Sequence, residues 1–129
     1  MWLPRAAVVA VHERLVAEHG GPAGVRDGSL LDSALASPRQ HHTYGETDVF
    51  VLAAALAHAI TRNHPFRDGN KRLSLALAGI FLELNGWRLV APETDAATMT
   101  LALAAREIEA PAFAAWLRTA CERVEPAGA

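Results

Sequence analysis

The sequence has little cysteine and little net charge. Cys121 is the only cysteine in 129 residues, so an internal disulfide is excluded and a reducing compartment is expected. We interpret Cys121 as a buried or half-buried thiol. The formal net charge is −2 at pH 7. No strongly basic surface is therefore implied, and we expect no nucleic-acid partner.

Long hydrophobic runs are also missing. The most apolar stretch, at residues 49–60, is too short to span a bilayer and contains His58. The N-terminal region holds only a short apolar stretch, interrupted at residues 12–14 by His, Glu and Arg, which is not the order of a signal peptide. We therefore expect a cytoplasmic protein without a membrane partner.

The residues that are present are typical of a globular protein, with 51% apolar and 20% charged residues. A chain of this length can bury a core and fits a single domain over residues 1–129. Apolar periodicity and turn signals predict an all-α fold with about six helices. We expect helices near residues 4–18, 49–62, 69–84, 95–105 and 111–123, and a short one between Asp27 and Pro38.

Local signals predict where these helices begin and end. Side chains suited to N-caps precede several of them: Asp27 or Ser29, Asp48, and Thr94. Pro38 is expected to end the second helix, with an exposed polar loop over residues 39–47. Residues 87–92 are expected to be extended, and the tail over residues 125–129 to fray.

The two most apolar helices flank a polar segment, NHPFRDGNKR, at residues 63–72. The sequences VFVLAAALAHAI and LSLALAGIFLEL are apolar almost all round, which marks both helices as central and buried. Charged side chains held at the ends of core helices need either water or a ligand. We therefore expect the functional residues in this segment.

The start of the helix after this segment predicts an anion site. The N–H groups of a first helical turn lack partners within the helix, and the helix dipole adds positive potential there. Gly69 permits close approach, Asn70 adds an amide, and Lys71 and Arg72 add two positive charges. Phosphate is the anion that this arrangement favours. A solvated polar turn is the alternative, although cations are disfavoured at a helix N-terminus unless an anion compensates them.

Three other residues of the segment have expected roles. His64 is either a solvated loop histidine or a base that takes a proton from a hydroxyl attacking a nucleotide phosphorus, and Pro65 favours an extended backbone at His64. Phe66 is expected to anchor the segment against the core. Asp68 is expected to bind Mg²⁺ beside the phosphates and also to cap the following helix.

The residues HPFRDGNKR, from His64 to Arg72, match the Fic/Doc signature H-x-F-x-(D/E)-(G/A)-N-(G/K)-R at every defined position. GGPAGVRDGSLLDSALASPRQ at residues 20–40, the Tyr44-Gly45 pair and the later FLELNGWRL are also similar to Doc-type proteins. The chain therefore resembles the Fic/Doc family over about residues 8–118. This resemblance implies a compact Fic/Doc-type helical domain in which two central buried helices flank the active-site loop.

Two positions distinguish the Doc branch within this resemblance. Fic-type adenylyl transferases have glycine at the position of Lys71 and a second arginine at the position of Leu75. The resemblance to Doc-type toxins implies transfer of the γ-phosphate of ATP to a serine or threonine hydroxyl of a translation factor such as elongation factor Tu, which inhibits translation. Gly69 stands where the best-known Doc pattern has alanine, so adenylyl transfer is the alternative.

The resemblance also implies roles by matched position. They are His64 as the base, Asp68 as the Mg²⁺ ligand, Gly69, Asn70, Lys71 and Arg72 as the ATP phosphate site, and Phe66 as the anchor of that site. Arg62 either faces the same site or only supplies a positive charge at the end of its helix. Residues 40–47 take the place of the flap that aligns the target, and His41 and His42 belong to this flap or to solvated surface.

Many Fic proteins carry an internal inhibitory motif, (S/T)-x-x-x-E-(G/N), and no serine or threonine of this chain begins one. The resemblance therefore implies a separate antitoxin of the Phd type, whose C-terminal segment folds into a groove on the toxin. Two hypotheses come from other classes. Arg5 and His12 have the R-x6-H spacing of some small ribonuclease toxins, and a non-catalytic module would keep the fold only to bind an antitoxin.

Overall fold

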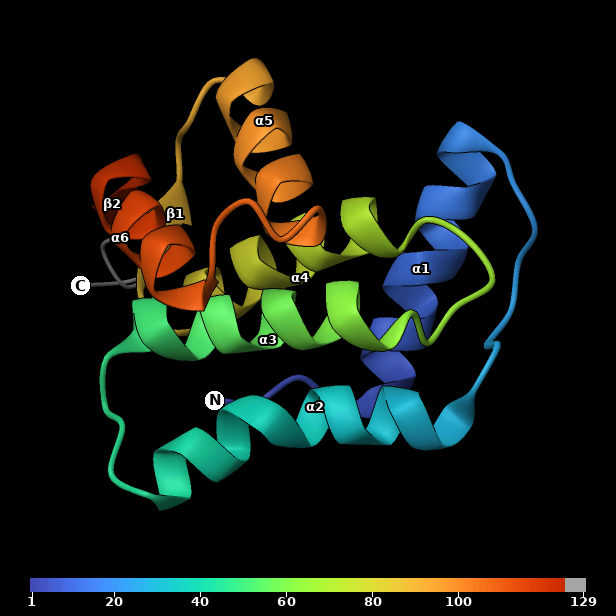
Figure 1. Ribbon diagram of the computed structural model, residues 1–129, viewed down its shortest axis with the longest axis horizontal. Helices are drawn as coiled ribbons and strands as arrows, with labels where there is room; N and C mark the ends of the chain where they lie inside the picture. Colours follow the sequence, from blue (N-terminus) through green and yellow to red (C-terminus); the bar gives the residue numbers. More distant parts are fainter. Residues whose placement is uncertain (125–129) are drawn as a thin grey trace.

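Helix α3 (Val49–Asn63) forms the centre of the computed structural model, which describes residues 1–124 (Figure 1). It is surrounded by α2 (Gly28–Thr43), α4 (Asn70–Leu84) and α6 (Ala110–Ala120). α4 returns alongside α3, so the loop that joins them lies at one end of the two core helices (Figure 1). The prediction of two central buried helices around this loop is confirmed.

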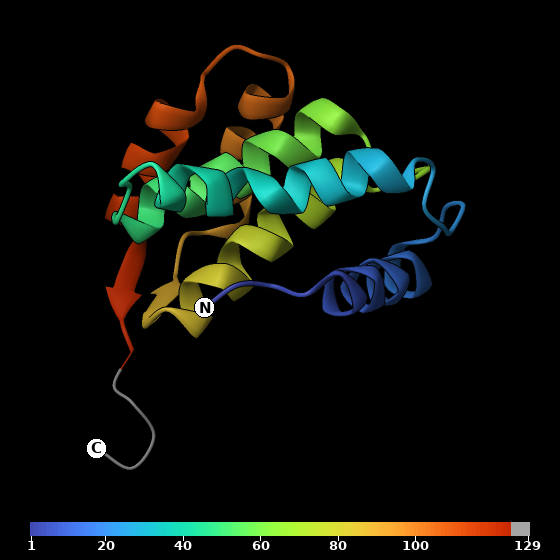
Figure 2. The ribbon, with the colours of Figure 1, turned by 90° about the horizontal axis from the view of Figure 1, so that it is seen from below.

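The remaining elements cover this pair of helices. Helix α1 (Arg5–His19) and helix α5 (Glu93–Ala104) both pack on α4, and α5 also contacts α3. Figure 2 shows α2 lying over α3, with α1 to one side. The short strands β1 (Trp87–Leu89) and β2 (Cys121–Arg123) pair antiparallel. The predicted all-α fold with about six helices is confirmed, with this two-stranded sheet added.

Two of the predicted caps are present. A carboxylate oxygen of Asp27 accepts from the N–H of Leu30 at 3.0 Å at the start of α2. One of Asp48 accepts from the N–H of Phe50 at 2.9 Å at the start of α3. Both bonds satisfy first-turn donors that lack partners within the helix, so local sequence signals correctly placed these two starts.

Helix α2 does not end at Pro38, contrary to the prediction. It continues to Thr43 with Pro38 buried inside it, so the predicted loop over residues 39–47 is helical as far as Thr43 and a turn and irregular segment after it. Proline lacks an N–H group and crowds the carbonyl one turn earlier, and a helix that contains it bends. Figure 1 shows the last part of α2 turned away from the first part. Burial of the proline ring in the core offsets the local cost.

Helix α5 begins two residues earlier than expected and lacks the predicted cap. Its N-cap is Pro92, with φ −55° and ψ 143°, and no side chain caps the helix, so Thr94 lies within the first turn instead. Proline has a φ suited to this position. Glu93 and Asp95 place negative charge in the first turn, which favours a helix start without an N-cap side chain.

Helix α6 ends at Ala120 rather than at residue 123, because the next three residues form β2. In this sheet Leu89 lies opposite Cys121, which confirms the extended segment predicted after α4. Cys121 is half-buried, as predicted, and burial raises the pKa of its thiol.

The tail predicted to fray, residues 125–129, lies outside the described residues. Within residues 1–124, no helix has the length and apolar character needed to cross a bilayer.

Candidate active site

The loop between α3 and α4 begins with an uncommon backbone at His64. α3 ends at Asn63, and His64 follows with φ 47° and ψ 55°, the left-handed region that non-glycine residues rarely adopt. The prediction that Pro65 holds His64 extended is wrong. The left-handed conformation nevertheless avoids the right-handed helical region that a following proline disfavours. The side chain of His64 is exposed, so its imidazole is accessible.

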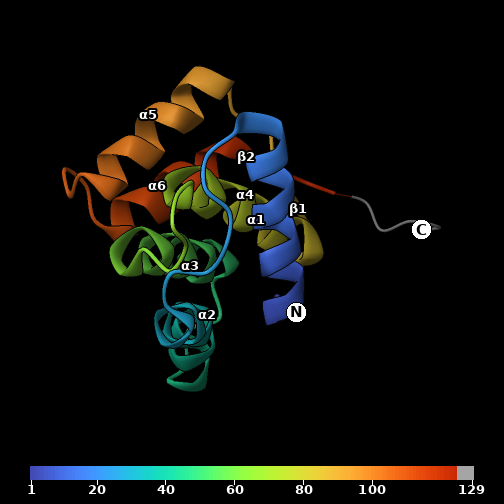
Figure 3. The same ribbon diagram turned by 90° about the vertical axis from the view of Figure 1, so that its right-hand side faces the viewer.

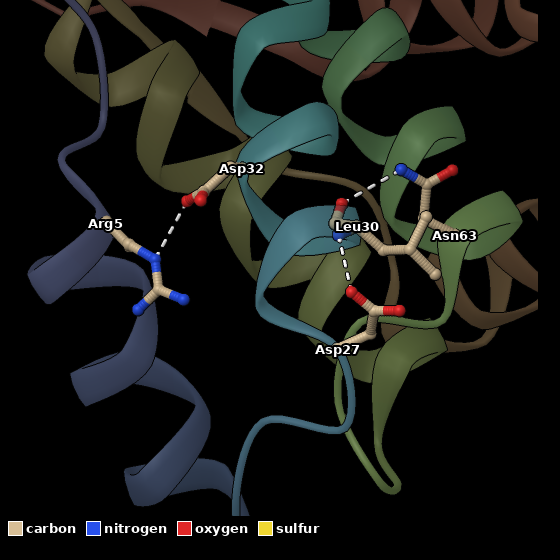
Figure 4. Close-up of polar contacts among 5 residues, drawn as sticks. All are labelled: Arg5, Asp27, Leu30, Asp32 and Asn63. Atoms are coloured by element: carbon tan, nitrogen blue, oxygen red, sulfur yellow. Dashed lines mark hydrogen bonds and ion pairs between the residues drawn. The ribbon is translucent and has the colours of Figure 1, made fainter.

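The side chain of Arg26 holds this backbone in place. Its Nε donates to the carbonyl oxygen of His64 at 2.7 Å, and its Nη2 donates to that of Asn63 at 2.9 Å. Nδ2 of Asn63 donates in turn to the carbonyl of Leu30 at 3.0 Å, beside the N-cap Asp27 (Figure 4). Carbonyl oxygens at a helix C-terminus attract a cation. Arg26 thus stabilises the turn that presents His64.

The backbone that precedes α2 lies against the same loop (Figure 3). The N–H groups of Arg26 and Asp27 both donate to the carbonyl of Pro65, at 2.8 and 3.1 Å. The N–H of Arg67 donates to the carbonyl of Gly24 at 3.2 Å. The segment between α1 and α2 is therefore the one that borders the predicted catalytic loop.

Residues 40–47 lie instead at the opposite end of α3 from His64 (Figure 1). α3 has 15 residues, which corresponds to about 22 Å along the helix axis. The prediction that residues 40–47 form the flap of the active site, with a place in it for His41 and His42, is therefore wrong. The reason is geometric, because this segment enters α3 at its N-terminus whereas the motif follows its C-terminus.

The side chain of Asn70 holds the loop together through hydrogen bonds to its backbone. This side chain is buried, with Oδ1 accepting from the N–H of Phe66 at 3.1 Å and Nδ2 donating to the carbonyl of Phe66 at 3.0 Å. Nδ2 also lies 3.4 Å from Nδ1 of His64, at the long end for a hydrogen bond. The amide of Asn70 is committed to the loop, so the backbone N–H is the group that Asn70 offers to an anion. Phe66 is itself buried, as predicted for the anchor.

Helix α4 begins without a side-chain cap. Its N-cap is Gly69, at φ 76° and ψ 16°, so the prediction that Asp68 caps the helix is wrong. Asp68 precedes the N-cap by one residue, and the left-handed turn at Gly69 separates its carboxylate from the first-turn donors. The N–H of Leu73 donates to the carbonyl of Gly69 at 2.9 Å. Among the described residues, the N–H groups of residues 70–72 have no partner, which favours an anion.

Positive charge at this helix start is unpaired. Lys71 and Arg72 are exposed, and neither has an ion pair within 4.0 Å in residues 1–124. Cations at a helix N-terminus are unfavourable without an anion, so their placement here indicates an anionic ligand.

Asp68 is also exposed and is unpaired within residues 1–124. No group of three or more His, Cys, Asp and Glu in the described chain could hold a metal ion, so a cation at Asp68 needs phosphate and water ligands.

A cavity of about 650 Å³ opens over these groups, a volume within the range of small-molecule sites. It is lined by most of the predicted site residues: His64, Asp68, Gly69, Asn70, Lys71 and Arg72. Phe66 is buried and does not line the cavity. Arg62 does not line it either and is exposed on the last turn of α3, which favours its interpretation as a charge at the helix C-terminus.

Residues beyond the predicted site complete the walls of the cavity. They come from α1, α4, α5 and the loop: Leu15, His19, Arg67, Leu75, Glu93, Ala97, Thr100 and Leu101. Leu75 was noted only as the position where Fic-type proteins have a second arginine, and nothing in the local sequence marks the others as part of a site. Arg26 gave no signal either, because it stands in a glycine-rich turn segment with no pattern that marks an arginine as a support.

Arg5 and His12 do not form an exposed pair. Nε of Arg5 lies 2.9 Å from Oδ1 of Asp32 in an ion pair (Figure 4). His12 is 1% exposed, and its Nε2 lies 2.7 Å from the carbonyl oxygen of Asp68. A buried imidazole that is engaged with the backbone cannot reach an RNA substrate, so the structure gives no support to the ribonuclease alternative.

Comparison with known proteins extends over the loop and both core helices. The model of the Fic/DOC family matches residues 2–82. The chain is 46% identical over 76 residues to the Toxin Doc of Mycolicibacterium smegmatis, a match that covers 56% of this chain and 57% of that protein. It is 31% identical over 112 residues to the Protein kinase doc of Escherichia phage P1, which covers 86% of this chain and 88% of the phage protein.

Proposed function

The chain belongs to the Fic/Doc family, in its Doc-type branch, and we propose that it is a toxin that transfers the γ-phosphate of ATP to a hydroxyl group of another protein. One observation carries the proposal. Within the described residues 1–124, Lys71 and Arg72 are unpaired beside free backbone N–H groups, and they line the same cavity as His64. The names of the two relatives, Toxin Doc and Protein kinase doc, support the same activity.

His64 acts as the general base in this reaction. Its Nε2 has no hydrogen-bond partner within residues 1–124 and accepts the proton of the target hydroxyl when the neutral ring carries its own proton on Nδ1. In that tautomer the 3.4 Å contact between Nδ1 and Nδ2 of Asn70 is not a hydrogen bond, because both atoms are donors. The hydroxyl oxygen forms a bond to the γ-phosphorus while the bond from that phosphorus to the bridging oxygen breaks, and ADP leaves. The base must stand beside the phosphate site for this step, and both line one cavity.

The start of α4 binds the phosphates. The free N–H groups of residues 70–72 donate to phosphate oxygens, and Lys71 and Arg72 stabilise their negative charge. Asp68 fits an Mg²⁺ ion, because its carboxylate is exposed, unpaired among the described residues and part of the cavity wall. When bound, Mg²⁺ neutralises charge on the phosphates.

The proposed target is a serine or threonine of a translation factor such as elongation factor Tu, and its modification inhibits translation. The proposed partner is an antitoxin of the Phd type. Both proposals rest on the family resemblance and on Lys71 and Leu75, which differ from the glycine and second arginine of Fic-type adenylyl transferases. The activity belongs in the cytoplasm, which contains ATP and translation factors.

The position of the radioactive label in ATP tests the proposal directly. The protein is incubated with Mg²⁺, purified elongation factor Tu and ATP labelled on either the α- or the γ-phosphate, with a cell lysate in parallel. Label from the γ-phosphate on a protein supports phosphoryl transfer, and label from the α-phosphate indicates adenylyl transfer. If no protein is labelled and calorimetry detects no ATP binding, the non-catalytic module becomes the better interpretation.

Two histidine variants separate the active site from the rest of the molecule. His64→Ala removes the base, so we expect transfer to fall by at least about 100-fold, within the range for loss of general-base catalysis. His41→Ala is the matched control, because His41 is exposed at the far end of α3 and should leave transfer unchanged. Equal rates in the two variants would argue against His64 as the base.

A further inference from the structure

A buried histidine lies beneath the catalytic loop and contacts Phe66 and Asp68 of the motif. His12 is on α1 and is 1% exposed. Its ring stacks on Phe66, with 3.9 Å between the ring centroids and 19° between the planes. Its Nε2 lies 2.7 Å from the carbonyl oxygen of Asp68 and 3.7 Å from the place that a Cβ would take at Gly69. His12 thus contacts the loop where it enters α4.

These contacts indicate which nitrogen of the His12 ring carries a proton. A carbonyl oxygen can only accept a hydrogen bond, so Nε2 of His12 carries the proton that is directed at Asp68. Nδ1 is buried and has no hydrogen-bond partner in residues 1–124. A second proton on Nδ1 would create a buried cation without a partner, which is unfavourable. Nε2 of His12 is therefore the ring nitrogen that donates to the carbonyl of Asp68.

The carbonyl that His12 holds belongs to the peptide bond between Asp68 and Gly69. This peptide lies at the point where the chain turns into α4 through the left-handed conformation of Gly69. If the peptide rotated, the start of α4 would turn away from the phosphates, and so would the carboxylate of Asp68. We propose that His12 is a positioning residue, whose hydrogen bond to the Asp68 carbonyl aims the start of α4 at the phosphates. The identity of the ligand rests on the proposed function.

A purely structural role does not explain the nitrogen atoms of this ring. The substitution His12→Phe would keep an aromatic ring against Phe66 and would remove the buried Nδ1, which has no partner in the described part of the chain. A buried polar atom without a partner is destabilising. What the imidazole adds is the Nε2–H donor to Asp68, so the hydrogen bond is the feature to test.

Two substitutions separate the donor from the ring. His12→Phe keeps the ring and deletes the donor, whereas His12→Gln deletes the ring and keeps an N–H group near the place of Nε2. The probe is pyrophosphate with Mg²⁺, because its binding can be measured by calorimetry without any transfer. We expect His12→Phe to weaken binding by about 10-fold, or about 1.4 kcal/mol, and His12→Gln to recover most of that loss.

Leu117→Ala is the control for a general loss of stability. Leu117 is buried in α6 and does not line the cavity, so this variant should lower the Tm and keep wild-type affinity for pyrophosphate. Wild-type affinity in His12→Phe, or no recovery in His12→Gln, would overturn the proposal. So would a wild-type protein that binds no pyrophosphate.

A measurement on the wild-type protein keeps the proposal testable even if a variant fails to fold. The ¹⁵N chemical shifts of the His12 imidazole distinguish the Nε2–H tautomer from the others. An Nε2 that carries no proton at neutral pH would overturn the proposal. A wild-type protein that binds pyrophosphate through His12 but labels no target would support this inference while refuting the proposed transfer.

Discussion

Two neighbouring glycines after α1 differ in the space that is available for a side chain. Gly20 and Gly21 have φ values of 81° and 102°, in the region that favours glycine. A Cβ at Gly21 would lie 2.6 Å from Oδ2 of Asp68, whereas a Cβ at Gly20 would meet no atom within 4 Å. Gly21 therefore leaves the space that the carboxylate of Asp68 occupies.

This difference predicts an effect on metal binding. Gly21→Ala should displace the Asp68 carboxylate and raise the Mg²⁺ concentration needed for ATP binding on the order of 10-fold, as when a metal ligand loses its supporting neighbour. Gly20→Ala shares the backbone strain, about 1 kcal/mol, and should leave the Mg²⁺ requirement unchanged. Titration of Mg²⁺ at fixed ATP measures both, and equal midpoints in the two variants would contradict the prediction.

Lys71 should affect stability and affinity in opposite directions. Lys71→Ala removes a cation from a helix N-terminus and adds a strong helix former, so we expect the free energy of unfolding to stay constant or rise by up to about 0.5 kcal/mol. The same change removes a charged contact to phosphate, worth about 1.5–3 kcal/mol, so the Kd for ATP should rise at least 10-fold.

Calorimetry and urea denaturation of one preparation measure the two effects of Lys71→Ala together. Arg88→Ala is the matched control, because Arg88 lies on β1 and pairs with Glu83 at 4.0 Å, outside the cavity. The control should keep the Kd of the wild-type protein. A loss of stability and affinity together in Lys71→Ala would indicate a structural role instead.

At the scale of elements, the end of α3 depends on a side chain from the segment before α2. Arg26 reaches two carbonyls with two different nitrogens, those of Asn63 and His64, and lysine lacks this fork. We expect Arg26→Lys and Arg26→Ala both to lower kcat by at least about 10-fold, because small displacements of a catalytic group are costly. The KM for ATP should change little, since the proposed phosphate site is at the start of α4.

Steady-state transfer kinetics with labelled ATP would separate these two effects of the Arg26 variants. Arg39→Ala is a suitable control, because Arg39 lies over the ring of Trp2, at 5.9 Å from its centroid, and does not line the cavity. The control should leave kcat unchanged. A raised KM with an unchanged kcat in the Arg26 variants would show that Arg26 acts on binding rather than on His64.

Elements whose own residues carry clear signals were predictable from the sequence. Elements that depend on contacts with residues far away in the chain were not. α3 and α4 follow from runs of apolar residues, and the start of α3 from its cap Asp48. Pro38 remained inside α2 because its ring is buried, a tertiary effect that outweighs the local penalty. Strand β2 forms only because β1 lies beside it, and the residues of β2 carry no such information.

The same distinction applies to the candidate site. His64 and Lys71 were found because the predicted site residues stand in one short segment with a specific pattern. The contacts that hold this segment join residues far apart: Arg26 to His64 across 38 positions and His12 to Asp68 across 56. A local sequence pattern does not indicate which distant carbonyl a side chain will contact. These supporting contacts, and the α5 residues that line the cavity, could therefore be identified only from the three-dimensional structure.

At the scale of the whole molecule, His58 links stability to pH. It is half-buried on α3 and lines a groove toward α2 and α6. Burial lowers the pKa of His58 below its ordinary value of 6.5, the charges of Arg62 and Arg106 lower it further, and Glu109 opposes them. The folded protein therefore binds the proton on His58 less readily than the unfolded chain does.

The unfolded state holds more protons at pH values between the lowered pKa of folded His58 and 6.5, so stability rises with pH in that range and falls as the pH drops below 6.5. From about pH 7.5 to about pH 5.5, this residue should lower the free energy of unfolding by less than about 1 kcal/mol, because the ring keeps contact with solvent. Urea denaturation at both pH values should show a smaller decline in His58→Gln, whereas His41→Gln, which alters an exposed histidine, should follow the wild type. An equal decline in all three proteins would assign the pH dependence to other groups.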